Sequence, residues 1–135
     1  MMRRTIISCA LSVLSVGVAA QEQTAKPLDY ETYCRLPDAQ SKRAAFGATT
    51  AESRGTLVRT HLERWRDANQ ARLDEKQKAT LAELIKSINA DTYANGPQGE
   101  EARVKSRAIS SEVERLFTKE DLIAMQPNAP CIGKT

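Results

Sequence analysis

The sequence predicts an all-α protein, a small helical bundle of about five helices organised around an antiparallel helical hairpin. Apolar residues recur three, four and seven positions apart through residues 49–71 and again through residues 74–89, which places them on one face of each helix. Only a short connection separates the two segments, so we expect them to fold back on each other. No segment has the alternating pattern of a β-strand.

Residues 1–20 have the features of a secretory signal peptide. Arg3 and Arg4 precede an apolar run over residues 6–18, and Val18-Ala19-Ala20 supplies the small residues that signal peptidase requires. The run is shorter than the roughly 20 residues that span a bilayer, which favours cleavage after Ala20 over a stable membrane anchor. We therefore expect an exported protein, either periplasmic or extracellular.

The remaining chain is long enough for one domain. We expect residues 21–27 to be disordered, residues 28–131 to form a single helical domain and residues 132–135 to be a tail. The formal net charge of +3 falls to +1 when Arg3 and Arg4 leave with the signal. Because the remaining charges are balanced and interleaved, nothing in them favours nucleic acid or an anionic membrane surface as a partner.

The cysteine count changes with the signal in the same way. Cys9 leaves, and the two cysteines that remain in an exported chain predict a disulfide between Cys34 and Cys131. Such a bond closes a loop of about 97 residues, for which loop entropy gives on the order of 4–5 kcal/mol. Two free thiols, or a bridge between chains, are the alternative.

Local signals place the first helices. Residues 28–36 form a short helix with tyrosines turned inward, and Pro37 suits the first turn of the next helix, over residues 38–46, which Gly47 ends. Thr49 and Glu52 have the spacing of a capping box at the start of the first hairpin helix. Gly55 lies in its second turn, where it costs about 1 kcal/mol relative to Ala and favours fraying.

The second half of the chain follows the same logic. Asp74 and Gln77 form a second capping pattern directly after Leu73. Residues 91–99 contain Asn, Gly and Pro in a turn-forming cluster, so we expect a loop there. A long helix over residues 100–117 and a short helix capped by Thr118 complete the bundle.

The candidate sites are few. His61 is the only histidine and lies on the apolar stripe with Trp65, so we expect a partly buried histidine with one hydrogen bond beside a core tryptophan. No nucleophile, base and orienting group form a catalytic set, and Cys34, His61 and Cys131 lack the spacing of a zinc site. We therefore expect no enzymatic activity, no cofactor and no metal. A binding groove for an unidentified protein partner is the remaining candidate, lined by Leu57, His61, Trp65 and Leu84.

The order of motifs from residue 30 to residue 131 resembles the bacteriocin fulvocin C-related family of exported bacterial proteins. The residues that carry this resemblance are Phe46, Thr50-Ala51-Glu52, Leu57, His61-Leu62-Glu63-Arg64-Trp65, Leu73-Asp74-Glu75-Lys76-Gln77, Leu84-Ile85, Leu116-Phe117 and Cys131. The resemblance implies an exported interaction or structural protein. The cysteine cluster of an antibacterial peptide does not follow Cys131, so the resemblance extends to the helical scaffold and implies no antibacterial activity.

Leu73-Asp74-Glu75-Lys76-Gln77 also resembles the Leu-Thr-x-x-Gln motif of periplasmic helical-hairpin chaperones and envelope-stress sensors. That resemblance implies an alternative function, the binding of unfolded chains in the same groove. This chain has one such motif and balanced charge, whereas those chaperones usually have two motifs and a strongly charged concave face.

Overall fold

The computed structural model describes residues 25–133, and this part of the chain is all-α, as predicted. The predicted signal peptide at 1–20 lies outside the described residues. The helices are α2 (Tyr30–Cys34), α3 (Ala39–Ala48), α4 (Ala51–Asn69), α5 (Glu75–Ser87), α6 (Gly96–Leu116) and α7 (Lys119–Ala124), with short 3-10 helices η1 (Gln70–Arg72) and η2 (Ala90–Tyr93).

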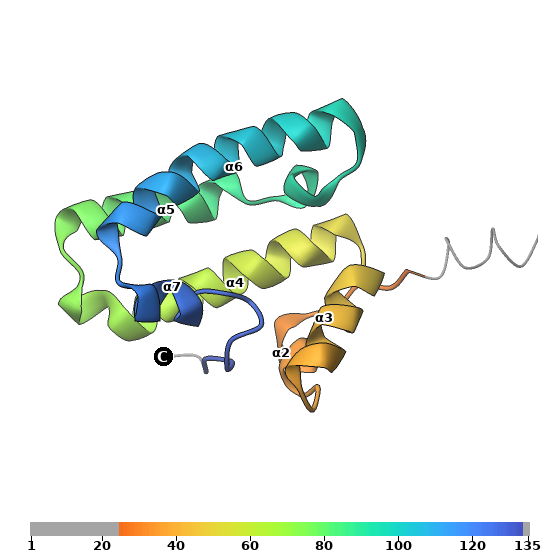
Figure 1. Ribbon diagram of the computed structural model, residues 1–135. Helices are drawn as coiled ribbons and strands as arrows, with labels where there is room; N and C mark the ends of the chain where they lie inside the picture. Colours follow the sequence, from red (N-terminus) through yellow and green to blue (C-terminus); the bar gives the residue numbers. More distant parts are fainter. Residues whose placement is uncertain (1–24, 134–135) are drawn as a thin grey trace, which may run out of the picture.

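The predicted helical hairpin forms the centre of the molecule. Helix α4 runs through the middle of Figure 1, η1 turns the chain, and α5 returns antiparallel to α4. Helix α6 then runs back alongside α5, while the end of α7 lies against α4. Helices α2 and α3 sit at the opposite side of α4 from α5 and α6, so α4 contacts both halves of the protein.

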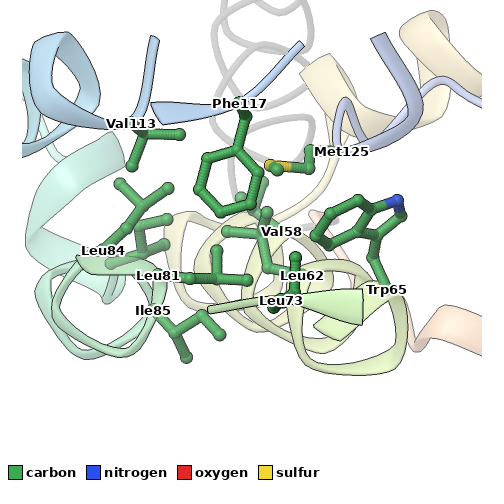
Figure 2. Packing of buried hydrophobic residues seen from close by; sticks show 11 residues of the cluster. Val58, Leu62, Trp65, Leu73, Leu81, Leu84, Ile85, Val113, Phe117 and Met125 are labelled. Atoms are coloured by element: carbon green, nitrogen blue, oxygen red, sulfur yellow. The ribbon is translucent and has the colours of Figure 1, made fainter. Parts of the chain in front are cut away.

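The main core lies where α4, α5, α6 and α7 meet. Figure 2 shows Phe117 pointing into this cluster between Val113 and Met125, above the α4 side chains. Trp65 is the core residue that the sequence predicted, and its ring meets the ring of Phe117 edge-on with centroids 5.8 Å apart. Edge-to-face pairs of this kind add to the free energy of burying two large aromatic side chains.

A second, smaller cluster joins α2 to α4. It consists of Tyr30, Tyr33 and Leu57, with the two cysteines packed against it. Phe46 of α3 packs against both clusters, so they form one continuous interior. The N-terminal helices are therefore fixed to the hairpin by apolar contacts, and α4 is the helix that carries the contacts of both clusters.

Side-chain caps start most of the helices. The Asp74 carboxylate accepts from the Gln77 backbone N–H at 2.8 Å, and the Gln77 side chain accepts from the Asp74 backbone N–H at 2.9 Å, which completes the predicted capping box of α5. The Gln77 side-chain amide also donates to the Leu116 carbonyl at 2.9 Å. One residue thus closes the start of α5 and ties it to the last residue of α6.

The predicted cap of α4 was wrong by one residue. Thr50, not Thr49, accepts from a backbone N–H, that of Ser53, while the Thr49 hydroxyl donates to the Lys26 carbonyl at 2.6 Å. Two adjacent threonines offer equivalent local caps, and the contact with Lys26 decides between them. Lys26, part of the segment 21–27 that was expected to be disordered, is therefore held against the start of α4.

Two helix ends also differ from the prediction. Helix α3 continues through Gly47 to Ala48, because the Thr49 N–H still bonds back to the Ala45 carbonyl. Helix α6 begins at Gly96 instead of Glu100, with Pro97 in its first turn, where the missing N–H of proline needs no partner. Most of the predicted loop at 91–99 is therefore η2 and the first turn of α6.

Gly55 serves close packing instead of the fraying that the sequence suggested. A Cβ at this position would lie 2.8 Å from the backbone carbonyl group of Asn89, at the start of η2. Gly55 is buried, and its missing side chain lets α4 and η2 approach backbone to backbone. This contact fixes the turn between α5 and α6 against the central helix.

Candidate functional site

An open cavity of about 400 Å³ lies between α4, α5, α6 and α7. Its apolar lining comes from the helical hairpin, from the core residues of the last two helices, and from the aromatic pair of α3 and η2: Val58, Leu62, Leu84, Ile88, Val113, Leu122, Met125, Phe46 and Tyr93. Figure 2 shows Val58, Leu62, Leu84 and Val113 in the cluster around Phe117 and Met125. A volume of this size falls within the range of small-ligand sites in proteins.

One edge of the cavity is polar. Ser106, Ser110 and Glu114 follow at four-residue intervals along α6, so they share one face of that helix. Gln126 adds an amide from the segment after α7. The cavity therefore offers an apolar floor and a row of hydrogen-bonding groups along one side, the combination that orients a ligand in a site of mainly apolar character.

The C-terminal strap, defined here as residues 125–133, forms one wall of this cavity. Met125, Gln126 and Pro127 line it directly. Beyond them Ala129 is buried, and the strap then crosses to α2, where the Cys34–Cys131 disulfide holds it. The predicted disulfide is thus present, and the two Cα atoms lie 5.9 Å apart, an ordinary separation for this bond.

His61 is buried beneath the strap with both ring nitrogens bonded. The Ala124 carbonyl lies 2.8 Å from Nε2 and can only accept, so Nε2 carries the proton. Nδ1 then accepts from the Tyr30 hydroxyl at 2.6 Å, and that hydroxyl oxygen accepts from the Ile132 backbone N–H at 3.2 Å. This chain of hydrogen bonds joins α2, α4, α7 and the strap through one neutral imidazole.

Burial lowers the pKa of His61, and the positive charge of Lys42 acts in the same direction, whereas the hydrogen bond to Ala124 opposes them. Burial likewise raises the pKa of the Tyr30 hydroxyl. The neutral forms of both groups are therefore the ones that the fold holds, and the pair is enclosed by protein instead of facing the cavity.

Two basic residues contact the strap where it meets α2. The Arg64 guanidinium lies over the Tyr30 ring at 4.6 Å and donates to the Ile132 carbonyl at 3.0 Å. The Lys42 ammonium lies 3.8 Å from Cys131 Sγ and 5.8 Å from the centre of the Tyr33 ring. These contacts place a positive charge beside one sulfur of the disulfide.

The structure separates the four residues proposed to line a groove. Leu57, His61 and Trp65 are 1%, 0% and 3% exposed and do not line the cavity, since Leu57 packs against α2, His61 bonds to the last residue of α7, and Trp65 packs against Phe117. Only Leu84, 9% exposed, lies in its wall. The α4 residues that line the cavity are the neighbouring pair Val58 and Leu62 instead. Periodicity identified the apolar face correctly but did not show which part of it the N-terminal helices would cover.

Sequence reasoning also missed the polar edge of the cavity and the role of Tyr30. Ser106 and Ser110 carry a signal that was available, since serines four residues apart on a helix share a face. Tyr30 carries none, because its partners are 31 and 102 residues away along the chain.

Comparisons with known proteins identify no relative. No family model matches the chain, and neither the curated proteins nor the solved structures contain a match. Within residues 25–133, no helix is long and apolar enough to cross a membrane. The same residues contain no group of three or more His, Cys, Asp or Glu side chains placed to hold a metal ion.

Proposed function

We propose that this chain is an exported, non-enzymatic interaction protein that holds an apolar portion of a partner protein in the cavity between α4, α5, α6 and α7. The observation that carries the proposal is the cavity itself, with its apolar floor and the polar row Ser106, Ser110 and Glu114. An apolar side chain or short segment of a partner would fill the floor, while its backbone would bond to the α6 edge.

Two further observations support this function. The Cys34–Cys131 disulfide suits an oxidising compartment outside the cytosol. The lining of the cavity supplies hydroxyl, amide and carboxylate groups along its edge, a set that suits recognition of a polar backbone. This is the kind of protein that the resemblance to the fulvocin C-related scaffold implies.

A substitution on the polar edge tests the cavity without disturbing the core. Ser110→Trp would place a large side chain across the opening, whereas Ser111→Trp, on an exposed neighbouring residue, is the matched control. We expect the uncharged fluorophore N-phenyl-1-naphthylamine to bind saturably to the native chain and to Ser111→Trp but not to Ser110→Trp. Equal binding by both variants, or none by the native chain, would contradict the proposal.

A chaperone that binds unfolded chains is the second candidate, and the open apolar cavity is the observation that favours it. The Leu73–Gln77 motif adds no support, because Asp74 and Gln77 are accounted for by the capping box and the bond to Leu116. A chaperone would suppress aggregation of a reduced model substrate at near-stoichiometric ratio, and Ser110→Trp would abolish that activity. A dedicated interaction protein would bind its partner from the same compartment without suppressing aggregation.

A further inference from the structure

The two sulfurs of the disulfide have different surroundings. The Lys42 ammonium of α3 lies 3.8 Å from Cys131 Sγ and 5.8 Å from the centre of the buried Tyr33 ring. Among the contacts of the described residues, this ammonium donates to Cys131 and not to Cys34. Both cysteines are half-buried, and neither residue is fully enclosed by the protein.

We propose that Cys34–Cys131 is a thiol-exchange site with a fixed direction, in which a dithiol reductant attacks Cys34, Cys131 leaves as the thiolate beside Lys42, and the C-terminal strap is released from the cavity. The cavity's response rests on the proposed function, whereas the direction of the exchange does not.

The direction follows from leaving-group chemistry. A thiolate of the reductant forms a bond to Cys34 Sγ, the Cys34–Cys131 bond breaks, and its electron pair stays on Cys131 Sγ. A sulfur that is better stabilised as the thiolate leaves faster, and the Lys42 ammonium gives Cys131 that advantage. The second thiol of the reductant then attacks the reductant's own sulfur in the mixed disulfide. Cys34 leaves, both cysteines take up protons, and the reductant departs as a disulfide.

The consequence for the cavity follows from where the strap is attached. Cys131 is the covalent attachment of residues 125–133 to α2. Once it is free, the strap is held only by noncovalent contacts: the hydrogen bonds from Arg64 to the Ile132 carbonyl and from the Ile132 N–H to Tyr30, and the burial of Met125 and Ala129. Met125, Gln126 and Pro127 of the same strap form a wall of the cavity, so loosening it opens that wall. Reduction therefore weakens retention of whatever the cavity holds.

The direction can be measured without any ligand. The oxidised full chain is treated with glutathione and quenched directly with excess iodoacetamide, which alkylates the freed thiolate, and the two cysteine peptides are mapped by mass spectrometry. We expect glutathione on Cys34 and carbamidomethyl on Cys131. In Lys42→Gln the preference should fall by about two- to five-fold, as expected for losing the attraction of one partly exposed ion pair, whereas Lys86→Gln, on an exposed lysine of α5, should leave it unchanged. Glutathione mainly on Cys131, or a ratio that Lys42→Gln does not alter, would overturn the proposed direction.

The effect on the cavity is measured separately. Binding of N-phenyl-1-naphthylamine is titrated before and after reduction with dithiothreitol and again after reoxidation, with far-UV circular dichroism recorded in each state. We expect loss of binding on reduction, recovery on reoxidation and retained helicity throughout. The double variant Cys34→Ser/Cys131→Ser should bind weakly whether or not dithiothreitol is present.

Each outcome has one meaning. Unchanged binding on reduction, or loss of helicity together with binding, overturns release of the strap as the switch. An oxidised chain that never binds the fluorophore overturns the proposed function and the regulation of the cavity together, while the glutathione experiment still decides the direction of exchange.

Discussion

His61 occupies the point at which α2, α4, α7 and the C-terminal strap meet, and its tautomer is set by its neighbours. A carbonyl fixes the proton on Nε2, and the Tyr30 hydroxyl then has to donate to Nδ1 while accepting from Ile132. A buried polar group costs free energy only when it lacks a partner. Here each polar atom has one, so a neutral histidine in the interior joins segments up to 102 residues apart.

Removing the Tyr30 hydroxyl tests this network. Tyr30→Phe leaves His61 Nδ1 without a donor and the Ile132 N–H without its acceptor, so we expect the free energy of unfolding to fall by about 1–3 kcal/mol. Tyr33→Phe is the matched control, because Tyr33 is equally buried but lies outside the network. Urea denaturation of both variants measures the difference. Equal losses would mean that the hydroxyl of Tyr30 contributes nothing specific.

The same histidine makes stability depend on pH. Its pKa is lowered in the folded state by burial and by Lys42, while in the unfolded chain it is close to the ordinary value of about 6.5. The unfolded state therefore binds the proton first, and the contribution of His61 is full above pH of about 6.5 and declines as the pH falls from there towards the folded-state pKa. Arg64 and Lys42 face this site with positive charge, and Glu31 of α2 is paired with Arg64, so no free carboxylate among these groups offsets the new charge.

The measurement compares the native chain with His61→Gln, which does not titrate. We expect the difference in free energy of unfolding between the two to shrink as the pH is lowered from 8 towards 5. A constant difference over that range would show that His61 titrates alike in the folded and unfolded states.

At the scale of the helices, packing decides what local rules leave open. Gly47 and Gly55 are both glycines within helices, and the sequence treats both as weak positions. A Cβ at Gly47 meets nothing within 4 Å, whereas at Gly55 it would meet the backbone of Asn89 at 2.8 Å. Backbone atoms cannot move aside as a flexible side chain can, so the second glycine is required by the contact between α4 and η2.

These two glycines predict opposite effects of one substitution. Gly47→Ala should stabilise the protein by up to about 1 kcal/mol through helix propensity alone. Gly55→Ala should destabilise it despite the same gain in propensity, because α4 and η2 must move apart. Thermal unfolding followed by circular dichroism measures both changes. A gain in stability for Gly55→Ala would show that the approach to Asn89 is looser than the structure has it.

The helices that the sequence placed best are those whose start is settled within four residues. Asp74 and Gln77 define α5, and no distant contact competes with them. Thr49 and Thr50 are locally equivalent, and only the Lys26 carbonyl distinguishes them. The same holds for the candidate site: Leu57 and Val58 lie on one apolar stripe, but α2 covers the first and leaves the second facing the cavity. That choice depends on Tyr30 and Tyr33, more than 20 residues away, and no periodicity records it.

In the molecule as a whole, α2 and the C-terminal strap are joined to each other beside the central helical hairpin. Helix α2 and the strap lie next to each other although 97 residues separate the bonded cysteines. Their attachment combines a disulfide, the His61 network and the bond from Arg64 to Ile132, and it completes one wall of the cavity. Stability and the shape of the site are therefore set by the same contacts.

Replacing both cysteines measures the covalent part of this attachment. Cys34→Ala/Cys131→Ala should lower the free energy of unfolding by up to about 4–5 kcal/mol, the loop-entropy limit for a closure of this length. The double variant avoids a free thiol and is compared with the oxidised native chain by guanidinium denaturation. A loss near zero would show that the noncovalent contacts alone keep α2 and the strap together.

The order in which the chain is synthesised gives the Cys34–Cys131 disulfide a further consequence. Residues of α4 and α5 can pair as soon as both have been synthesised, since their contacts are local along the chain. Tyr30, Cys34 and the covered side of α4 must wait for Ala124, Cys131 and Ile132, which lie 63 to 102 residues after their partners in the chain. A chain truncated before Cys131 would keep its helices, but α2 would lack its disulfide and the Tyr30 hydroxyl would lack its bond from Ile132. A chain that lacks the strap is thereby distinguished by an exposed thiol at Cys34.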